Sequence, residues 1–184
     1  MSNIFFDAGD LKECGSNVII GKTVRIRYPE LIEIGDNVII DDFTYISSSL
    51  KIASNVHISS GCKIIGGPNS SVEMHNFSTL SPNVVLAAGS DDYIGGIATP
   101  LVDSQFKGNA VIGKIVINQH SIIGSNSTVL PNVFFNTGSA VGANSLVNCD
   151  LDEWTLYAGV PAKKIRMRDK SAILNFEKEF YAQS

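Results

Sequence analysis

Three histidines and one adjacent acidic pair are the side chains in this sequence best suited to moving a proton or holding a polar ligand. The histidines are His57, His75 and His120, and the acidic pair is Asp91 and Asp92. Imidazole exchanges protons near neutral pH, so each histidine is a candidate base, although each also fits an exposed strand or corner position. The two carboxylates would bind hydroxyl or ammonium groups of a ligand, or else they belong to a solvated loop.

The spacing of the histidines argues against a metal centre. A zinc site needs imidazole, thiolate or carboxylate ligands that converge on one point, and two of them are normally close in sequence. His57, His75 and His120 are instead 18 and 45 residues apart. A zinc enzyme is therefore disfavoured, and we expect the protein to work without a metal ion.

The three cysteines, Cys14, Cys62 and Cys149, are far apart in the sequence and odd in number. Cys14 and Cys62 occupy positions that the repeat described below turns toward the interior, so we expect both to be core side chains. A disulfide framework is not indicated. The expected location is therefore a reducing cytoplasm.

The overall charge is acidic, with a formal net charge of −4 over 184 residues. Proteins that bind nucleic acid normally present a broad basic surface, so we expect no such partner. The first residues lack a basic region followed by an apolar run, and no apolar stretch is long enough to span a bilayer. We therefore expect neither a secretory signal nor membrane insertion. One local exception is a basic cluster within eight positions, formed by Lys163, Lys164, Arg166, Arg168 and Lys170.

The elements that must position these side chains follow from a six-residue repeat of aliphatic residues. Neither an amphipathic helix nor a simple two-sided strand has a period of six. A strand, a corner, a second strand and a second corner do have it, and this pattern is typical of a parallel β-helix. The repeat is clearest in two stretches: Ile34, Ile40, Ile46, Ile52, Ile58 and Ile64, and then Val111, Ile117, Ile123, Val129, Phe135, Val141 and Val147.

Breaks in the repeat divide the chain. Gly66-Gly67-Pro68-Asn69 has the composition of a small bulge, and the repeat then fails over residues 87–110, which we interpret as a long protruding loop. Three six-residue units make one triangular turn, which predicts about six turns within residues 1–150. Residues 151–184 form a separate C-terminal segment, in which Asp169 is placed to N-cap a short α-helix. The expected fold class is therefore all-β.

Three sequence segments resemble the hexapeptide-repeat acyltransferases. They are Ile-Gly-Ser-Asn-Ser-Thr-Val-Leu-Pro-Asn-Val at 123–133, Val-Gly-Ala-Asn-Ser-Leu-Val at 141–147, and Ala-Gly-Val-Pro-Ala-Lys-Lys-Ile-Arg at 158–166. The resemblance covers nearly all of residues 14–168 and is closest to the branch that acetylates galactosides, maltose, antibiotics and bacterial surface sugars. It implies a left-handed parallel β-helix, a homotrimer, and acetyl-CoA bound in the clefts between subunits.

The same resemblance gives the basic cluster a role with coenzyme A. The phosphates of coenzyme A would pair with Lys163, Lys164, Arg166 and Arg168 through charge-assisted hydrogen bonds. The alternative is a solvated basic surface. Gln119 and Ala143 would lie along the pantetheine arm of the cofactor, with Asn148 nearby.

The sequence departs from this family at the general base. Galactoside and maltose acetyltransferases open their long loop with a His-Pro pair, and that histidine takes the proton from the acceptor hydroxyl. Asp91 aligns with this histidine and Asp92 with the proline. We expect Asp91, Asp92 and Tyr93 in the loop, together with Ser59, to contact the acceptor. His57 and His75 are the other candidate bases, and His120 lies at a corner beside the expected cofactor track.

The missing histidine favours an amine acceptor, because a neutral amine attacks a thioester with less help than a hydroxyl. The first hypothesis is therefore acetyl-CoA-dependent N-acetylation of a nucleotide-linked amino sugar for bacterial surface polysaccharide. The alternative is O-acetylation of a sugar hydroxyl, with His57 or His75 as base. A non-catalytic β-helix scaffold is a more remote third hypothesis. Neither the sugar nor the position that is acetylated follows from the sequence.

Overall fold

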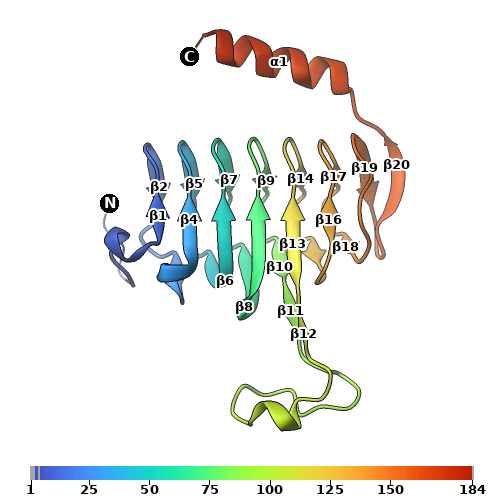
Figure 1. Cartoon of the computed structure of the whole chain (residues 1–184). Coiled ribbons are helices and arrows are strands. Elements are labelled where there is room, and N and C mark those ends of the chain that lie inside the picture. Colours follow the sequence, from blue (N-terminus) through green and yellow to red (C-terminus); the bar gives the residue numbers. More distant parts are fainter. Residues whose placement is uncertain (1–2, 4, 184) are drawn as a thin grey trace.

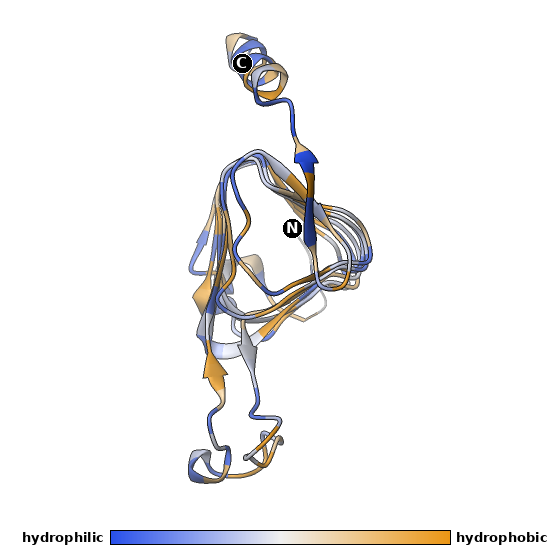
Figure 2. Ribbon diagram, turned by 90° about the vertical axis from the view of Figure 1, so that its right-hand side faces the viewer, coloured by the Kyte–Doolittle hydropathy of each residue, from blue (hydrophilic) through white to orange (hydrophobic). Residues whose placement is uncertain are grey.

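The computed structural model describes residue 3 and residues 5–183 of the chain. It is a triangular prism of short parallel strands, with a hairpin loop leaving one edge and a C-terminal helix lying over another (Figures 1 and 2). The predicted parallel β-helix is confirmed. It has six complete turns and a partial seventh, in which Leu151 bridges to Phe135 and one further strand follows.

The strands form three faces. Face one contains β1(Glu13–Cys14), β4(Ile32–Ile34), the ends of β6(Tyr45–Ile52) and β8(Lys63–Met74), β13(Lys114–Ile117) and β16(Phe134–Phe135). Face two contains β2(Val18–Ile20), β5(Val38–Ile40), β7(Val56–Ile58), β9(Thr79–Leu80), β14(Ile122–Ile123), β17(Ala140–Val141), β19(Thr155–Ala158) and the antiparallel β20(Lys163–Met167). Face three contains β3(Arg25–Ile26), the starts of β6 and β8, β10(Val85–Ala87), β15(Thr128–Val129) and β18(Leu146–Val147).

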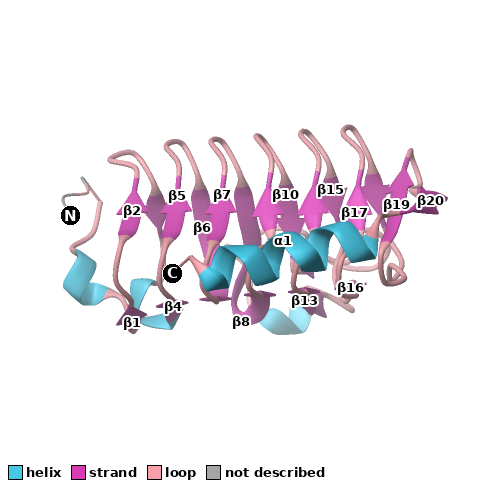
Figure 3. Cartoon of the chain, turned by 90° about the horizontal axis from the view of Figure 1, so that it is seen from above, coloured by secondary structure: helices cyan, strands magenta, loops and turns pink. Residues whose placement is uncertain are grey.

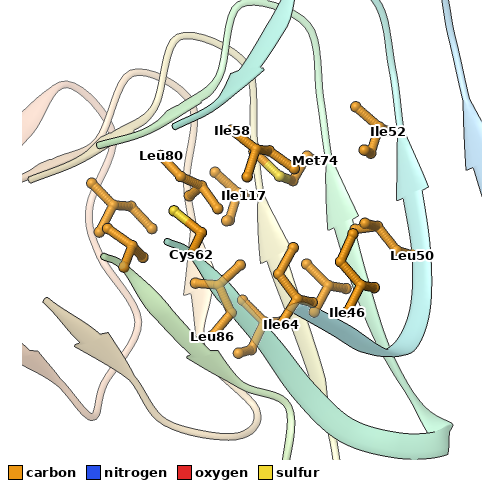
Figure 4. Packing of buried hydrophobic residues seen from close by; sticks show 14 of the residues in the cluster. Ile46, Leu50, Ile52, Ile58, Cys62, Ile64, Met74, Leu80, Leu86 and Ile117 are labelled. Atoms are coloured by element: carbon orange, nitrogen blue, oxygen red, sulfur yellow. The ribbon is translucent and has the colours of Figure 1, made fainter. Parts of the chain in front are cut away.

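The aliphatic repeat forms the core because residues at the same place in successive turns lie directly over one another. On face two, Ile40 is in register with Ile58, and Ile58 with Leu80. Such ladders fill the interior of the prism, as Figure 4 shows for ten labelled side chains. A single turn could not bury its own aliphatic residues, so neighbouring turns stabilise one another.

Two positions of the predicted repeat are wrong. Cys14 is exposed, because β1 is in the first turn and pairs only with β4. Val111 is 39% exposed, because it belongs to β12(Val111–Ile112), which pairs with β11(Gly89–Ser90) at the base of the loop. Cys62, in contrast, is buried as predicted.

Residues with positive φ turn the corners between faces. An L-residue rarely adopts this conformation, and asparagine tolerates it better than most. Seven corner asparagines do so: Asn17, Asn37, Asn55, Asn83, Asn126, Asn132 and Asn144. At the corner between faces one and two, the bulkier Phe77, His120 and Trp154 adopt the same conformation. These three rings give that corner an aromatic edge.

The glycine bulge and the long loop lie at the predicted breaks in the sequence repeat. Gly66 and Gly67 have positive φ within β8 and form the bulge. The loop leaves the same edge of the prism through the hairpin β11–β12 and carries a short 3₁₀ helix at Ser104–Phe106. Two further 3₁₀ helices lie at Ala8–Asp10 and Pro29–Leu31. The C-terminal helix α1(Lys170–Ala182) begins at Asp169, whose carboxylate accepts a hydrogen bond from the Ala172 amide, as predicted. Seen from above, α1 runs along the prism (Figure 3).

Candidate functional site

A hollow of about 1150 Å³ lies between the long loop and the glycine bulge. The bulge contributes Gly66, Pro68 and Asn69, and the loop contributes Asp91 and Tyr93 among others. Both segments leave the prism at the edge between faces three and one, which is why residues distant in sequence meet here (Figure 1). Two of the predicted acceptor-contacting residues therefore line one cavity.

The two adjacent aspartates have different surroundings. The carboxylate of Asp92 accepts hydrogen bonds from the amides of Ile94, Gly95 and Asn109, at 2.8 to 3.0 Å. These bonds, that from Asn109 first, hold the pKa of Asp92 below its ordinary value. Asp92 thus ties the two ends of the loop together. Asp91 is among the residues that line the hollow, and no described residue hydrogen-bonds to its carboxylate.

His57 makes a hydrogen-bond contact that the sequence did not indicate. Its Nε2 atom lies 2.8 Å from Oδ2 of Asp41, and both side chains are nearly half exposed. The β-helix brings them together because Ile40 is in register with Ile58, so the residues next to these strand ends are neighbours. Ser59 follows at the same corner and is buried. The spacing of the repeat already places Ile40 beside Ile58, so it could have predicted that Asp41 lies near His57.

His75 lies elsewhere. Its side chain is exposed and borders a small depression of about 180 Å³ with Lys51 and Glu73, on face one and its upper edge. The structure therefore does not bring His75 together with Asp91. His57 also lies on a different face from Asp91 within one chain.

The basic cluster divides into engaged and free side chains. Lys164 Nζ lies 3.2 Å from Oδ2 of Asp152. Arg168 donates from Nη1 to the carbonyl oxygens of His120 and Gly138, both at 2.7 Å, and burial lowers its pKa. Lys163 and Arg166 lie on the exposed strand β20 and have no ion-pair partner among the described residues. These two cations are available to an anionic ligand.

Gln119 and His120 are covered by the C-terminal helix. Gln119 donates from Nε2 to Oε1 of Glu177 at 2.6 Å, and His120 Nε2 lies 3.1 Å from Oε2 of the same residue. The His120 ring is stacked on Phe77, with ring centroids 5.3 Å apart. Gln119 is thus held at the corner between faces one and two.

The two other predicted cofactor contacts are exposed. Ala143 follows β17 at the corner between faces two and three, and Asn148 follows β18. Ala143 and Gln119 therefore lie at opposite edges of face two. Within one chain, these two predicted contacts of the pantetheine arm are therefore not adjacent.

The described residues contain no group of three or more histidine, cysteine, aspartate or glutamate side chains placed to hold a metal ion. Among the same residues, no helix has the length and apolar composition needed to cross a bilayer.

Known proteins resemble the whole chain. No family model matches the sequence. A dTDP-4-amino-4,6-dideoxy-D-glucose acyltransferase from Escherichia coli is 34% identical over 173 residues, which are 92% of this chain and 88% of that protein. WbbJ from Escherichia coli strain K12, described as a lipopolysaccharide biosynthesis O-acetyl transferase, is 33% identical over 74% of this chain and 60% of its own.

Solved structures of sugar acyltransferases also resemble the chain. A serine-to-cysteine variant of AntD, an N-acyltransferase from Bacillus cereus, crystallised with dTDP-4-amino-4,6-dideoxyglucose and coenzyme A, superposes with a TM-score of 0.91 at 35% identity over 99% of both chains. A maltose O-acetyltransferase from Clostridium difficile 630 superposes with a TM-score of 0.59 at 17% identity, covering 88% of this chain and 72% of that one, and so shares the fold alone. The predicted family is confirmed: the chain belongs to the sugar acyltransferases of the left-handed β-helix, hexapeptide-repeat class.

Proposed function

We propose that this chain transfers an acyl group from acyl-CoA to the amino group of a nucleotide-linked amino sugar. The observation that carries the proposal is the full-length match to AntD, which was crystallised with both dTDP-4-amino-4,6-dideoxyglucose and coenzyme A. The acetyl group is the expected donor. AntD has also been crystallised with 3-hydroxybutyryl-CoA, so longer acyl groups belong in the test.

The chemistry of the hollow supports an amine acceptor. Asp91 lines the cavity, and its carboxylate would hold an ammonium or amino group there. An amine nitrogen attacks a thioester readily once it is held close, whereas a hydroxyl needs a stronger base. Tyr93 borders the same cavity and offers an aromatic ring to the acceptor. Asp92 supports this site indirectly by holding the loop.

A spacing in the relative supports Asp91 and adds Ser81. AntD has been crystallised with single substitutions at one serine and at one aspartate ten positions later. Ser81 and Asp91 have the same spacing here. Ser81 follows β9, and its hydroxyl has no hydrogen-bond partner among the described residues. We assign Ser81 to the acceptor side of the site, with Ser59 one turn before it.

The coenzyme would lie against β20. Lys163 and Arg166 are the free cations there and can pair with its phosphates. Ala143 and Asn148 are exposed on the adjoining turns and can contact the pantetheine arm. Gln119, Lys164 and Arg168 already have partners within the chain, so we assign them no direct contact with the coenzyme.

We propose that the site is completed by a second copy of the chain in a homotrimer. Face two presents Ile19, Ile39 and Ile122 to solvent, with 57%, 38% and 39% of their surfaces exposed. An apolar strip of this kind is typical of a subunit interface. Packing it against the loop edge of a neighbour would bring His57 toward the partner's hollow.

The reaction is assigned to the cytoplasm, in the building of bacterial surface polysaccharide. Cys14, Cys62 and Cys149 are all free, in keeping with a reducing compartment. In this assignment, acyl-CoA is the donor and a nucleotide-linked amino sugar is the acceptor.

O-acetylation of a sugar hydroxyl is the second candidate function. The similarity to WbbJ, described as an O-acetyl transferase, favours it. Coenzyme release measured with dTDP-4-amino-4,6-dideoxyglucose, its 4-hydroxy counterpart and simple glycosides separates the two functions. Turnover of hydroxyl acceptors alone would rule out the amine proposal. Absence of acyl-CoA binding by calorimetry would instead indicate a scaffold.

A further inference from the structure

His57 and Asp41 form a polar pair on face two, near the exposed isoleucines of its apolar strip. The outward positions of face two include Ile19, Ile39 and Ile122, and His57 stands next to Ile39 in register. A strip that is to be covered by a neighbour would gain more from another apolar residue at position 57. A titratable pair at this place therefore points to a chemical role.

The pair has a fixed geometry. His57 Nε2 lies 2.8 Å from Asp41 Oδ2, and the amide of Asp41 donates to the carbonyl of Ile58 at 2.9 Å, which anchors the backbone beside the ring. A carboxylate at Nε2 favours the tautomer that keeps its hydrogen there. The Nδ1 atom then carries a lone pair, and no described residue hydrogen-bonds to it.

The charges of face one show what a purely structural pair looks like. Glu33 lies between Lys12 and Lys51 and pairs with both. These side chains are partly open to solvent, where such ion pairs contribute little to stability. Asp41 is the titratable side chain that contacts His57 among the described residues. Ile39 and Thr79 are in register with His57 on the two neighbouring strands. Glu33 thus pairs with two lysines, whereas Asp41 pairs with a single imidazole.

The geometry points to Asp41 as the positioning residue that holds His57 ready to accept a proton from the acceptor amine during acyl transfer. This inference rests on the proposed function. The amine nitrogen attacks the thioester carbonyl carbon, the carbon–sulfur bond breaks, and the nitrogen gives up one proton. His57 takes that proton on Nδ1 and returns it to the leaving sulfur, so that an amide and a thiol are formed. Asp41 stabilises the imidazolium between these two steps.

The test compares full-length variants by pH dependence of kcat/KM, with dTDP-4-amino-4,6-dideoxyglucose and acetyl-CoA as substrates. His57→Gln should lower kcat about 100-fold, in the range for loss of a general base. Asp41→Asn should lower it about tenfold and shift the acidic limb of the profile, and Asp41→Glu should recover part of the loss. Glu33→Gln is the control, because it breaks an ion pair in the same turn on face one and should leave the rate unchanged.

Two results would overturn the inference. One is an active wild-type enzyme whose Asp41→Asn variant keeps the wild-type kcat and pH profile. The other comes from ¹⁵N NMR of the wild-type histidines, which needs no variant: a hydrogen on Nδ1 of neutral His57 rather than on Nε2 contradicts the geometry. A wild-type protein that turns over no amine acceptor defeats the proposed function instead, so the two failures are distinguishable.

Discussion

The Nε2 atom of His120 lies 3.1 Å from Oε2 of Glu177 and joins the fifth turn of the β-helix to α1. Gln119 donates to the other oxygen of the same carboxylate. Phe180 adds an edge-on contact to Phe77, with ring centroids 5.6 Å apart. The C-terminal helix is thus held on its own chain through a few contacts at the aromatic corner.

Glu177→Ala should release α1 without unfolding the β-helix. The remaining contacts of the helix are mostly exposed, and an isolated helix of 13 residues is marginal in water. Amide hydrogen exchange should therefore accelerate throughout α1 and stay slow in the strands. Glu179→Ala is the control, since Glu179 has no ion pair among the described residues. Unchanged protection of α1 in Glu177→Ala would show that the carboxylate does not hold the helix.

The loop should lose order in acid. The folded pKa of Asp92 is depressed below its ordinary value, so its stabilising effect is present above that value and is lost as pH falls through the folded pKa. The protection factors of the amides in residues 93–109 should fall at strongly acidic pH. Asp92→Asn should show the same loss of protection at pH 7, and Asp103→Asn, whose carboxylate caps nothing, should not. Equal exchange in all three proteins would contradict this role.

Cys62 should resist thiol reagents. Burial raises its pKa to about 11, so little thiolate is present at pH 8. Cys14 and Cys149 are exposed and should react quickly. A colorimetric thiol titration of the native protein should therefore show two fast thiols and a third that reacts only after denaturation. Cys62→Ala should keep both fast thiols; loss of one of them would contradict the assignment.

Coenzyme A binding should depend on Lys163 and Arg166 but not on Lys164. Replacing either free cation with alanine should weaken binding about tenfold, as expected for one charge-assisted hydrogen bond. Lys164→Ala is the matched control, because Lys164 is paired with Asp152. Calorimetry at low and high salt measures all three. Equal losses in the three variants would show that the basic cluster acts only through its net charge.

The scaffold could be predicted from sequence because each aliphatic residue of the repeat has one possible place in the prism. Ile58 follows Ile40 by one turn, and the structure stacks them. The prediction failed at Cys14, because its strand β1 pairs only with β4 among the described strands. It also missed part of the seventh turn, because Leu151 and Tyr157 lie beyond the point where the spacing of strands becomes irregular.

The site was less predictable, because side-chain partners depend on distances that a repeat does not contain. Asp91 could be proposed because it aligns with the family's histidine in the loop that begins where the repeat stops. Nothing local distinguishes the free Asp91 from Asp92, whose bond from Asn109 spans 17 positions. Gln119 fitted a family pattern, yet its partner Glu177 is 58 residues away on another element.

The acceptor assay tests the central claim most directly. The purified protein should release coenzyme A from acetyl-CoA when given dTDP-4-amino-4,6-dideoxyglucose, and mass spectrometry should show one acetyl group as an amide on the sugar nitrogen. Asp91→Asn should reduce acceptor turnover at least tenfold while leaving acetyl-CoA binding intact. Coenzyme release with hydroxyl acceptors only, or an unchanged rate in Asp91→Asn, would contradict this account of the site.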